Sequence, residues 1–379
     1  MTTQTSHGPR WFAGLRSALA AVLITGVLVA TGLAPASATP PVRPTATVMT
    51  YNVYLGANLQ PLFGEDNLVR LIQKAAAILA HFDTVDFRIR AVAIAHQIIE
   101  QDPDVVALQE VSLLQTSPPS SPPRFTTRYD FLQILLGELE RQGHPFHAVS
   151  INPNFTGTLP VDFVGSLARL TDRNVIIVPG GDPASELITS NPAQDVYDRT
   201  LDVPLGGMTF HAQRGWASID VVFHGSPFRF FDTHFEAFDP DVRKDQVAEL
   251  VQIMSSSPYP VVLAGDINLF PRDVRALDDA AWKLLSRAGF RDAWVVGECF
   301  EPRYTAGQTD DLDNVPSILD NTVDYVLFDK DFETKPVEQS CDIAGEELDD
   351  RTNTVPALWP SDHAAVAVDL RIAKPWLNT

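Results

Sequence analysis

Short apolar segments that turn polar where they end limit the folds that this chain can adopt. Residues 105–111 read VVALQEV, and residues 260–269 read PVVLAGDINL. Short apolar runs bounded by turn residues are typical of buried strands. Between them stand segments such as residues 87–100, in which apolar side chains recur at helical spacing. Strands and helices that alternate along a chain favour a mixed sheet with helices packed outside it.

Predicted strands and helices alternate over most of the chain. No segment between Val42 and Ile372 has the composition of a linker, so we expect one continuous α/β domain over residues 46–373, after an entry segment at 39–45. The turn HGSP predicts a hairpin between two strands. The further predicted strands are residues 46–55, 174–178, 216–223, 228–235, 322–328 and 364–372. The further predicted helices are residues 129–141, 242–254 and 280–288.

The first 38 residues differ from the rest of the chain. Arg10 and Arg16 are the only Lys or Arg in this stretch, and no acid occurs there. An apolar run at 18–33 is followed by the small residues Ala-Ser-Ala. A basic start, an apolar run and an A-x-A site describe a secretory signal peptide, so we expect export with cleavage near Ala38. The alternative is a membrane anchor, for which the apolar run is short and lacks a basic flank after it.

Charge and cysteine content narrow the class of protein further. The formal net charge is −20, and it becomes −22 without residues 1–38, which hold two basic residues and no acid. Such a field repels nucleic acid at long range, so no stable nucleic-acid partner is expected. Cys299 and Cys341 are the only cysteines. In an exported protein a disulfide between them is expected, with two buried thiols as the alternative.

Eight polar residues lie at the rims of these apolar segments, where rigid strands can support a site. Taken singly, each has an ordinary explanation, such as a core hydrogen bond, a solvated strand end or a turn cap. Their order and local contexts are more informative than any one of them. The eight are Asn52, Glu110, His234, Asp266, Asn268, Asp324, Asp362 and His363.

In these contexts the chain resembles the endonuclease/exonuclease/phosphatase superfamily, whose fold is that of deoxyribonuclease I. The matching segments run in family order from Thr50 to Val366: TYNVYL, ALQEV, DRNVIIV, DTHFEAF, AGDINLFP, TVDYVLF and SDHAAV. The resemblance implies a two-sheet mixed α/β sandwich with helices on the outside. It also implies hydrolysis of a phosphate ester with Mg²⁺ or Mn²⁺, with the number of ions left open.

The resemblance also assigns roles to the metal-binding side of the site. Glu110 matches the metal-binding glutamate of the family, and Asn52 the asparagine beside that metal. Asp362 matches an acid near the same ion. The residue types suit this role without the resemblance, because carboxylate and amide oxygens are the donors that hard divalent cations prefer.

On the other side, Asp266 and Asn268 match the pair that positions the attacking water and the phosphate. His363 matches a histidine assigned as base or phosphate ligand, and Asp324 its orienting carboxylate. His234 matches the histidine of the N-T-H segment found in the nuclease and sphingomyelinase branches. A carboxylate-oriented imidazole can move a proton, and the Asn268 amide and a protonated His234 can donate to phosphoryl oxygens.

Two further residues have open roles. Asp232 stands where the family segment N-T-H has Asn, so it either pairs with a nearby Arg or adds charge to the site. Arg173, in DRNVIIV, either contacts the substrate or supports the fold.

The substrate is the least determined part of the prediction. The first hypothesis is a secreted, monomeric phosphodiesterase acting on a phospholipid or sphingomyelin head group at a membrane surface. An extracellular nuclease, a phosphomonoesterase and a non-catalytic binding module are the alternatives. Recognition is expected from loops at 56–66, 117–128 and 152–162. Their apolar side chains favour a lipid, or else anchor the loops: Leu59, Leu62, Phe63 and Phe155.

Overall fold

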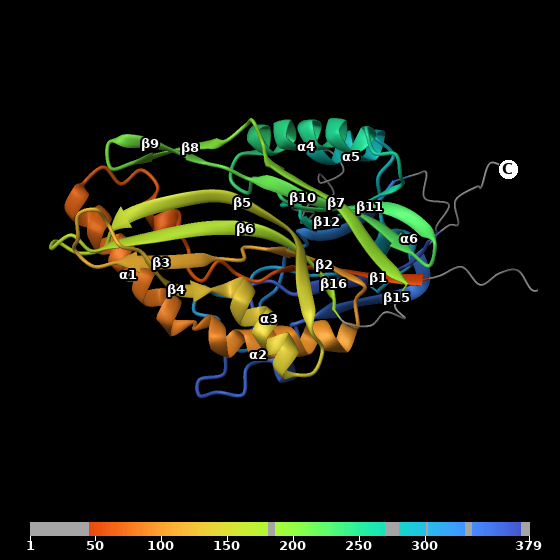
Figure 1. Cartoon of the computed structure of the whole chain (residues 1–379), viewed down its shortest axis with the longest axis horizontal. Helices are drawn as coiled ribbons and strands as arrows, with labels where there is room; N and C mark the ends of the chain where they lie inside the picture. The colour runs from red at the N-terminus through yellow and green to blue at the C-terminus, as the bar shows by residue number, and fades with distance from the viewer. Residues whose placement is uncertain (1–44, 181–185, 270–279, 301, 330–335, 373–379) are drawn as a thin grey trace, which may run out of the picture. The chain divides into compact units, whose positions relative to one another are not determined.

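Two β-sheets packed face to face form the centre of the protein, and helices cover the outer face of each sheet (Figure 1). The computed structural model describes residues 45–180, 186–269, 280–300, 302–329 and 336–372. The predicted signal peptide, its cleavage point and almost all of the entry segment lie outside these residues. None of the helices within the described ranges is long and apolar enough to cross a membrane.

The first sheet has eight strands in the order β15-β16-β1-β2-β6-β3-β4, with β5 also paired to β6. Strand β1 is parallel to β2 and antiparallel to β16, so these three lie at the middle of the sheet. The bounds are β1 (Thr45–Asn52), β2 (Val105–Gln109), β3 (Leu113–Ser117), β4 (Thr126–Asp130), β5 (Phe146–Pro160), β6 (Leu167–Pro179), β15 (Pro336–Ala344) and β16 (Ala365–Arg371).

The second sheet has six strands in the order β13-β14-β12-β11-β10-β7. Strand β12 is parallel to β11 and antiparallel to β14. A separate two-stranded hairpin, β8–β9, leaves the chain between β7 and β10. The bounds are β7 (Leu187–Val196), β8 (Leu201–Leu205), β9 (Met208–Ala212), β10 (Gly215–Phe223), β11 (Ser226–His234), β12 (Val261–Asp266), β13 (Arg291–Asp292) and β14 (Asp324–Phe328).

Helices α1, α2 and α3 pack on the first sheet, and α4 and α5 pack on the second. Four of these helices begin at an Asn or Asp whose side chain accepts a backbone N–H of the first turn, which satisfies donors that the helix itself leaves free. The bounds are η1 (Gln60–Leu62), α1 (Leu68–Thr84), α2 (Phe87–Gln101), α3 (Phe131–Arg141), α4 (Pro240–Ser255), α5 (Ala280–Arg287), α6 (Ala293–Val296) and η3 (Leu348–Asp350).

The central strands are apolar on both faces because both faces are buried. Val48 of β1 points into the core between the two sheets, and its neighbour Met49 points into the core beneath the helices. Successive side chains of a strand point to opposite faces, so one strand contributes to two cores. This explains why the predicted strands read as continuous apolar runs rather than as alternating ones.

The structure confirms the sandwich fold and corrects some predicted elements. The predicted loop at 152–162 is mostly strand β5, which ends at Pro160. The predicted helix at 129–141 begins only at Phe131, because Asp130 caps it and Tyr129 belongs to β4. Helices α1 and α6 and strands β3, β4, β7, β8, β9, β13 and β15 were not predicted.

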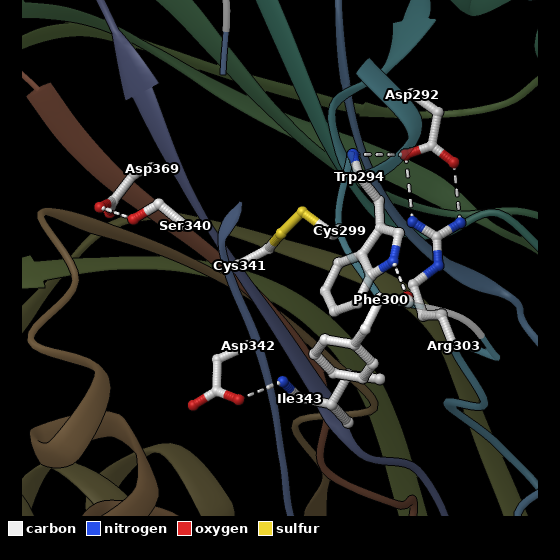
Figure 2. Close-up of a disulfide and its surroundings, with 10 residues drawn as sticks. All are labelled: Asp292, Trp294, Cys299, Phe300, Arg303, Ser340, Cys341, Asp342, Ile343 and Asp369. Atoms are coloured by element: carbon white, nitrogen blue, oxygen red, sulfur yellow. Dashed lines mark hydrogen bonds and ion pairs between the residues drawn. A yellow bond between two sulfur atoms is a disulfide. The ribbon is translucent and has the colours of Figure 1, made fainter. Parts of the chain in front are cut away.

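The disulfide between Cys299 and Cys341 is present, as predicted (Figure 2). It joins the segment after α6 to β15, with the two Cα atoms 6.3 Å apart, and closes a loop of chain with a sequence separation of 42 residues. Beside it, the side chain of Arg303 pairs with Asp292 at 2.8 Å. The closed loop contains Asp324, so the disulfide restrains the region that carries one of the predicted site residues.

Candidate active site

Strand register brings three of the predicted residues into one row on the second sheet. His234 at the end of β11 pairs in register with Asp266 at the end of β12, and Asp266 pairs with Asp324 at the start of β14. On the first sheet, β1 ends at Asn52 opposite Gln109, so that Glu110 follows at the same end. The eight predicted residues therefore come from corresponding ends of the two stacked sheets.

Asp266 is the junction of the site and is almost fully buried. Its Oδ2 accepts a hydrogen bond from Asn52 Nδ2 at 3.1 Å and lies 3.3 Å from His234 Nε2. Its Oδ1 accepts the backbone N–H of Asn268 at 3.1 Å. Because Asn52 belongs to the first sheet and Asp266 to the second, this contact joins the sheets at the site. Burial, and then the nearby charge of Asp324, raise the pKa of Asp266 to about 7.

His363 is oriented by Asp324, as the resemblance implied. The Nδ1 atom of His363 lies 2.9 Å from Asp324 Oδ2, and Nε2 lies 3.9 Å from Asp266 Oδ2. Burial alone would lower the pKa of His363, but the surrounding carboxylates, led by Asp324 and Asp362, raise it well above its usual value. The imidazole is therefore protonated near neutral pH and can donate from Nε2.

His234 differs from the expectation that it is protonated. It is buried, and Arg214 Nη1 lies 3.1 Å from its Nδ1. Burial, followed by the positive charge of Arg214, lowers the pKa of His234 well below its usual value. The ring is therefore neutral and accepts from Arg214 at Nδ1, while its Nε2 lies 3.3 Å from Asp266 Oδ2.

Glu110 and Asp362 line one cavity of about 250 Å³ at the end of the sheets. Glu110 Oε2 accepts the backbone N–H of Leu55 at 2.5 Å, and Ser361 Oγ donates to Asp362 Oδ1 at 3.3 Å. Burial, and then the charge of Asp362, raise the pKa of Glu110 to about 7. Glu110 has a φ of 60°, a left-handed conformation that is uncommon for a residue with a side chain and recurs at functional sites.

Hydrogen bonds from buried side chains hold the loops of the site together. Ser361 Oγ donates to the carbonyl of Asn52 at 2.7 Å, which ties the start of the S-D-H segment to the end of β1. Arg90 of α2 donates from Nη1 to the carbonyls of Val53 at 2.8 Å and Pro360 at 2.7 Å. These bonds satisfy backbone groups that no strand partner reaches.

Two of the predicted amides make contacts that bear on their roles. The Oδ1 atom of Asn52 accepts the backbone N–H of Tyr54 at 3.0 Å, and its Nδ2 donates to Asp266. In this arrangement Asn52 positions Asp266, and a role as metal ligand stays a prediction. Asn268 Nδ2 donates to the carbonyl of Phe235 at 2.9 Å, which leaves one N–H of that amide for a substrate.

Three residues that were not predicted from the sequence line the same cavity: Asp172, Arg214 and Glu236. The guanidinium of Arg214 lies 4.0 Å from a carboxylate oxygen of Asp172 and of Glu236. It places a positive charge in the cavity that holds Glu110 and Asp362. The only sequence signal is an Arg directly before the strand β10, which no motif marks.

The structure decides the roles of Asp232 and Arg173. Asp232 is fully buried behind the site, where it accepts from Gln109 Nε2 at 2.8 Å. Burial raises its pKa well above the usual value, so it is a neutral acid and adds no charge to the site. Arg173 donates to the carbonyl of Val111 at 2.7 Å and to Asp130 Oδ1 at 2.6 Å. It supports the fold.

The donor set suits a hard divalent cation. Glu110 and Asp362 present oxygen ligands to one cavity, and each has a pKa raised by burial. Among the described residues, three buried carboxylate oxygens have no hydrogen-bond partner: Asp172 Oδ1, Asp324 Oδ1 and, behind the site, Asp232 Oδ2. Asp266, Asp324 and His363 offer another set of donor atoms, within 4.8 Å of one another. That second set includes a protonated imidazole, which must lose its proton before it can bind a metal.

Comparison with known proteins places this site in a family. The model of the Endonuclease/Exonuclease/phosphatase family matches residues 49–363, which include all eight predicted site residues. No curated protein sequence matches the chain.

Solved structures share the fold at low sequence identity. A family protein from Bacteroides thetaiotaomicron is similar with a TM-score of 0.53 and 16% identity, over 86% of this chain and 95% of that one. A family protein from Bacteroides vulgatus gives a TM-score of 0.52 and 14% identity, over 87% and 100%. A mannosyl-6-phosphatase from Bacteroides thetaiotaomicron gives 0.50 and 17%, over 86% and 99%.

Proposed function

Since the chain belongs to the endonuclease/exonuclease/phosphatase family, whose members hydrolyse phosphoesters, we propose that it is a secreted, divalent-metal-dependent phosphodiesterase. The observation that carries the proposal is the contact series Asp324–His363–Asp266, which stands beside a cavity lined by the acids Glu110 and Asp362. One end of the site can exchange protons, and the other offers oxygen ligands to a cation.

In this proposal Asp266 accepts the proton that water loses as it attacks the phosphorus. A pKa of about 7 suits a general base that works near neutral pH, because the group is then both partly ionised and sufficiently basic. The side chain of Asn52 and the backbone of Asn268 donate to this carboxylate, and His234 lies beside it. They fix its orientation, so that little reorganisation is needed in the transition state.

Protonated His363 donates from Nε2 to a phosphoryl oxygen. Its other nitrogen is held by Asp324, so the imidazole has one orientation and keeps its proton. Arg214, which lines the cavity, and the remaining N–H of the Asn268 amide are further donors for the anionic phosphate. Donors fixed in advance of the reaction stabilise the charge that develops on these oxygens.

Glu110 and Asp362 would hold the divalent cation, which is Mg²⁺ or Mn²⁺ in this proposal. When bound, such an ion neutralises the charge that grows on the leaving oxygen and polarises the phosphoryl group. We prefer this pair to Asp266, Asp324 and His363 because the imidazole there is protonated and already bonded to Asp324. Export is part of the same proposal, and a disulfide suits an oxidising compartment.

The test is an assay of the protein from residue 39 onward with bis(p-nitrophenyl) phosphate, in Mg²⁺ or Mn²⁺. We expect turnover that EDTA abolishes and that added metal restores. Faster hydrolysis of p-nitrophenyl phosphate than of the diester would instead identify a phosphomonoesterase. The enzyme proposal fails if neither ester turns over with any of several divalent metals.

A further inference from the structure

A second cavity, of about 460 Å³, opens beside the catalytic one. Its walls are helix α1, the η1 loop, strand β5 and the β8–β9 hairpin, and the side chains that line it are almost all apolar. Leu59, Phe63, Phe155 and Phe210 line both cavities, so the apolar space continues into the one that holds Glu110.

Specific contacts hold this space open. The hairpin is tied to the η1 loop by Gly64 N–H to the Pro204 carbonyl at 2.9 Å, and by Gly206 N–H to the Glu65 carbonyl at 2.8 Å. The buried carboxylate of Glu65 in turn binds Lys74 of α1 at 2.7 Å. These contacts fix the spacing of the hairpin, the loop and the helix. Without such contacts, apolar walls would be expected to move together until the space was filled at the usual packing density of a protein interior.

Aromatic side chains stand at the passage between the two cavities. Phe155 and Phe210 meet edge to face with ring centroids 5.9 Å apart, and Phe63 and Phe238 do so at 5.7 Å. At the outer wall, Met208 at the tip of the hairpin is 76% exposed. An exposed apolar wall that leads into an apolar cavity beside a polar catalytic site is the arrangement of a binding site for an amphiphile.

We propose that the apolar cavity holds the hydrocarbon chain of the substrate, so that the enzyme acts on amphiphilic phosphate esters. The phosphate would then lie against Arg214 and the acids of the catalytic cavity, with the chain passing between the aromatic pairs. This inference rests on the proposed function for its chemistry. The binding of an alkyl phosphate, however, does not depend on turnover, so the two can fail separately.

The experiment measures the binding of alkyl phosphates to the protein from residue 39 onward, by calorimetry with Mg²⁺ present and below micelle-forming concentrations. The series runs from inorganic phosphate through ethyl and octyl to dodecyl phosphate. We expect the Kd to fall about fourfold for each methylene until the cavity is filled. A neutral dodecyl glucoside, which has the chain without the phosphate, should bind at least about tenfold more weakly than dodecyl phosphate.

Three variants locate the binding to this cavity. Ala75→Phe narrows the cavity, and Met208→Asp places a charge at its exposed wall. Both changes should make the Kd depend less steeply on chain length. Because Met208 is exposed, Met208→Asp should not impair folding. Ile188→Asp is the matched control, because Ile188 is exposed on β7 and lines neither cavity. It should bind as the wild type does.

The inference is overturned if dodecyl phosphate binds no more than twofold tighter than ethyl phosphate. It is also overturned if Met208→Asp and Ile188→Asp have the same effect, or if the glucoside binds as tightly as the phosphate. A protein that binds alkyl phosphates with the expected dependence on chain length but hydrolyses no ester would disprove the proposed function and leave the amphiphile site standing. A protein that hydrolyses esters but whose Kd for alkyl phosphates does not change with chain length would support the proposed function and disprove the amphiphile site.

Discussion

The acid–base half of the site and its metal half differ in how many of their polar atoms have hydrogen-bond partners within the protein. The metal half consists of Glu110 and Asp362. In the acid–base half, made of Asp266, Asp324 and His363, Asp266 accepts two hydrogen bonds and His363 is oriented by Asp324. In the metal half, the hydrogen bonds found among the described residues are one from a backbone N–H to Glu110 and one from a hydroxyl to Asp362. In the first half Asp266 and His363 are held by fixed partners, although the Oδ1 atom of Asp324 has none. The two acids of the second half face a cavity.

This contrast indicates which half of the site needs an added ligand. A carboxylate with several fixed donors is stable in a buried site without further help. Two carboxylates that share a cavity repel each other, and this repulsion contributes to the raised pKa of Glu110. A bound cation would remove that repulsion, so the metal half should depend on added ion and the acid–base half should not.

The largest effect is expected from Asp266→Asn. This change removes the proposed base while keeping its shape, and kcat for bis(p-nitrophenyl) phosphate should fall about 10³-fold. Since the loss is in proton transfer, a hundredfold rise in Mg²⁺ should not restore it. Steady-state rates over a metal titration check this. Recovery of activity at high metal would place Asp266 in the metal half instead and break the contrast.

Glu110→Gln should lower the rate about 10²-fold at limiting metal, because a neutral amide is a weaker ligand for a hard cation. Here part of the activity should return as Mn²⁺ is raised, which distinguishes this half from the other. Glu186→Gln is the matched control, since Glu186 is an exposed acid away from the site. A metal dependence of Glu110→Gln identical to that of the wild type would remove Glu110 from the ion.

Asp324→Asn should lower kcat about tenfold and change the pH profile. The negative charge of Asp324 raises the pKa of His363, so its removal lowers that pKa. If protonated His363 is the active form, activity is lost as pH rises through its pKa, and the alkaline limb of the profile should move to lower pH. The acidic limb, set by Asp266, should also move to lower pH, because the charge of Asp324 raises the pKa of Asp266 as well. An unmoved alkaline limb would contradict the proposed role of this pair.

The smallest effect is expected from Asp232→Asn, which restores the residue typical of the family segment. Asp232 is neutral in the folded protein, so activity should stay within about twofold. Its pKa is raised on folding, so the stability that it contributes is fully present below its unfolded pKa near 4 and is lost as pH rises toward its folded pKa.

The Asp232→Asn variant should therefore unfold like the wild type near pH 4 and be more stable than the wild type at pH 7. The gain should be about 1.4 kcal/mol for each pH unit above the unfolded pKa of the carboxyl, for as long as the folded protein keeps it neutral. Thermal unfolding of both proteins at the two pH values measures this. If the two proteins differed in stability by the same amount at pH 4 and at pH 7, Asp232 would be ionised in the folded protein.

Much of this site could be predicted because its residues break apolar runs. Asp266 ends β12 and Glu110 follows directly after β2, and both strands are otherwise largely apolar, a contrast that is visible in the sequence alone. Arg214 could not be found in this way. It lies in the short connection between β9 and β10, and only the folding of β10 beside β11 brings it to His234.

The missed elements have physical reasons too. Strand β5 contains Pro153, a residue that argues against a strand, and the structure accommodates it at an irregularity in the pairing with β6. The β8–β9 hairpin did carry a signal, because Gly206 and Gly207 both have positive φ and a Gly-Gly pair favours such a turn. The apolar cavity depends on contacts between α1, β5 and this hairpin, so the sequence showed only some of its side chains.

The most direct test of the two-half account is a calorimetric titration of the protein with Mn²⁺, beside Glu110→Gln and Asp266→Asn. The account predicts that Glu110→Gln weakens Mn²⁺ binding at least about tenfold, while Asp266→Asn changes it less than about threefold. Equal binding by the wild type and Glu110→Gln, with loss of binding in Asp266→Asn, would contradict it.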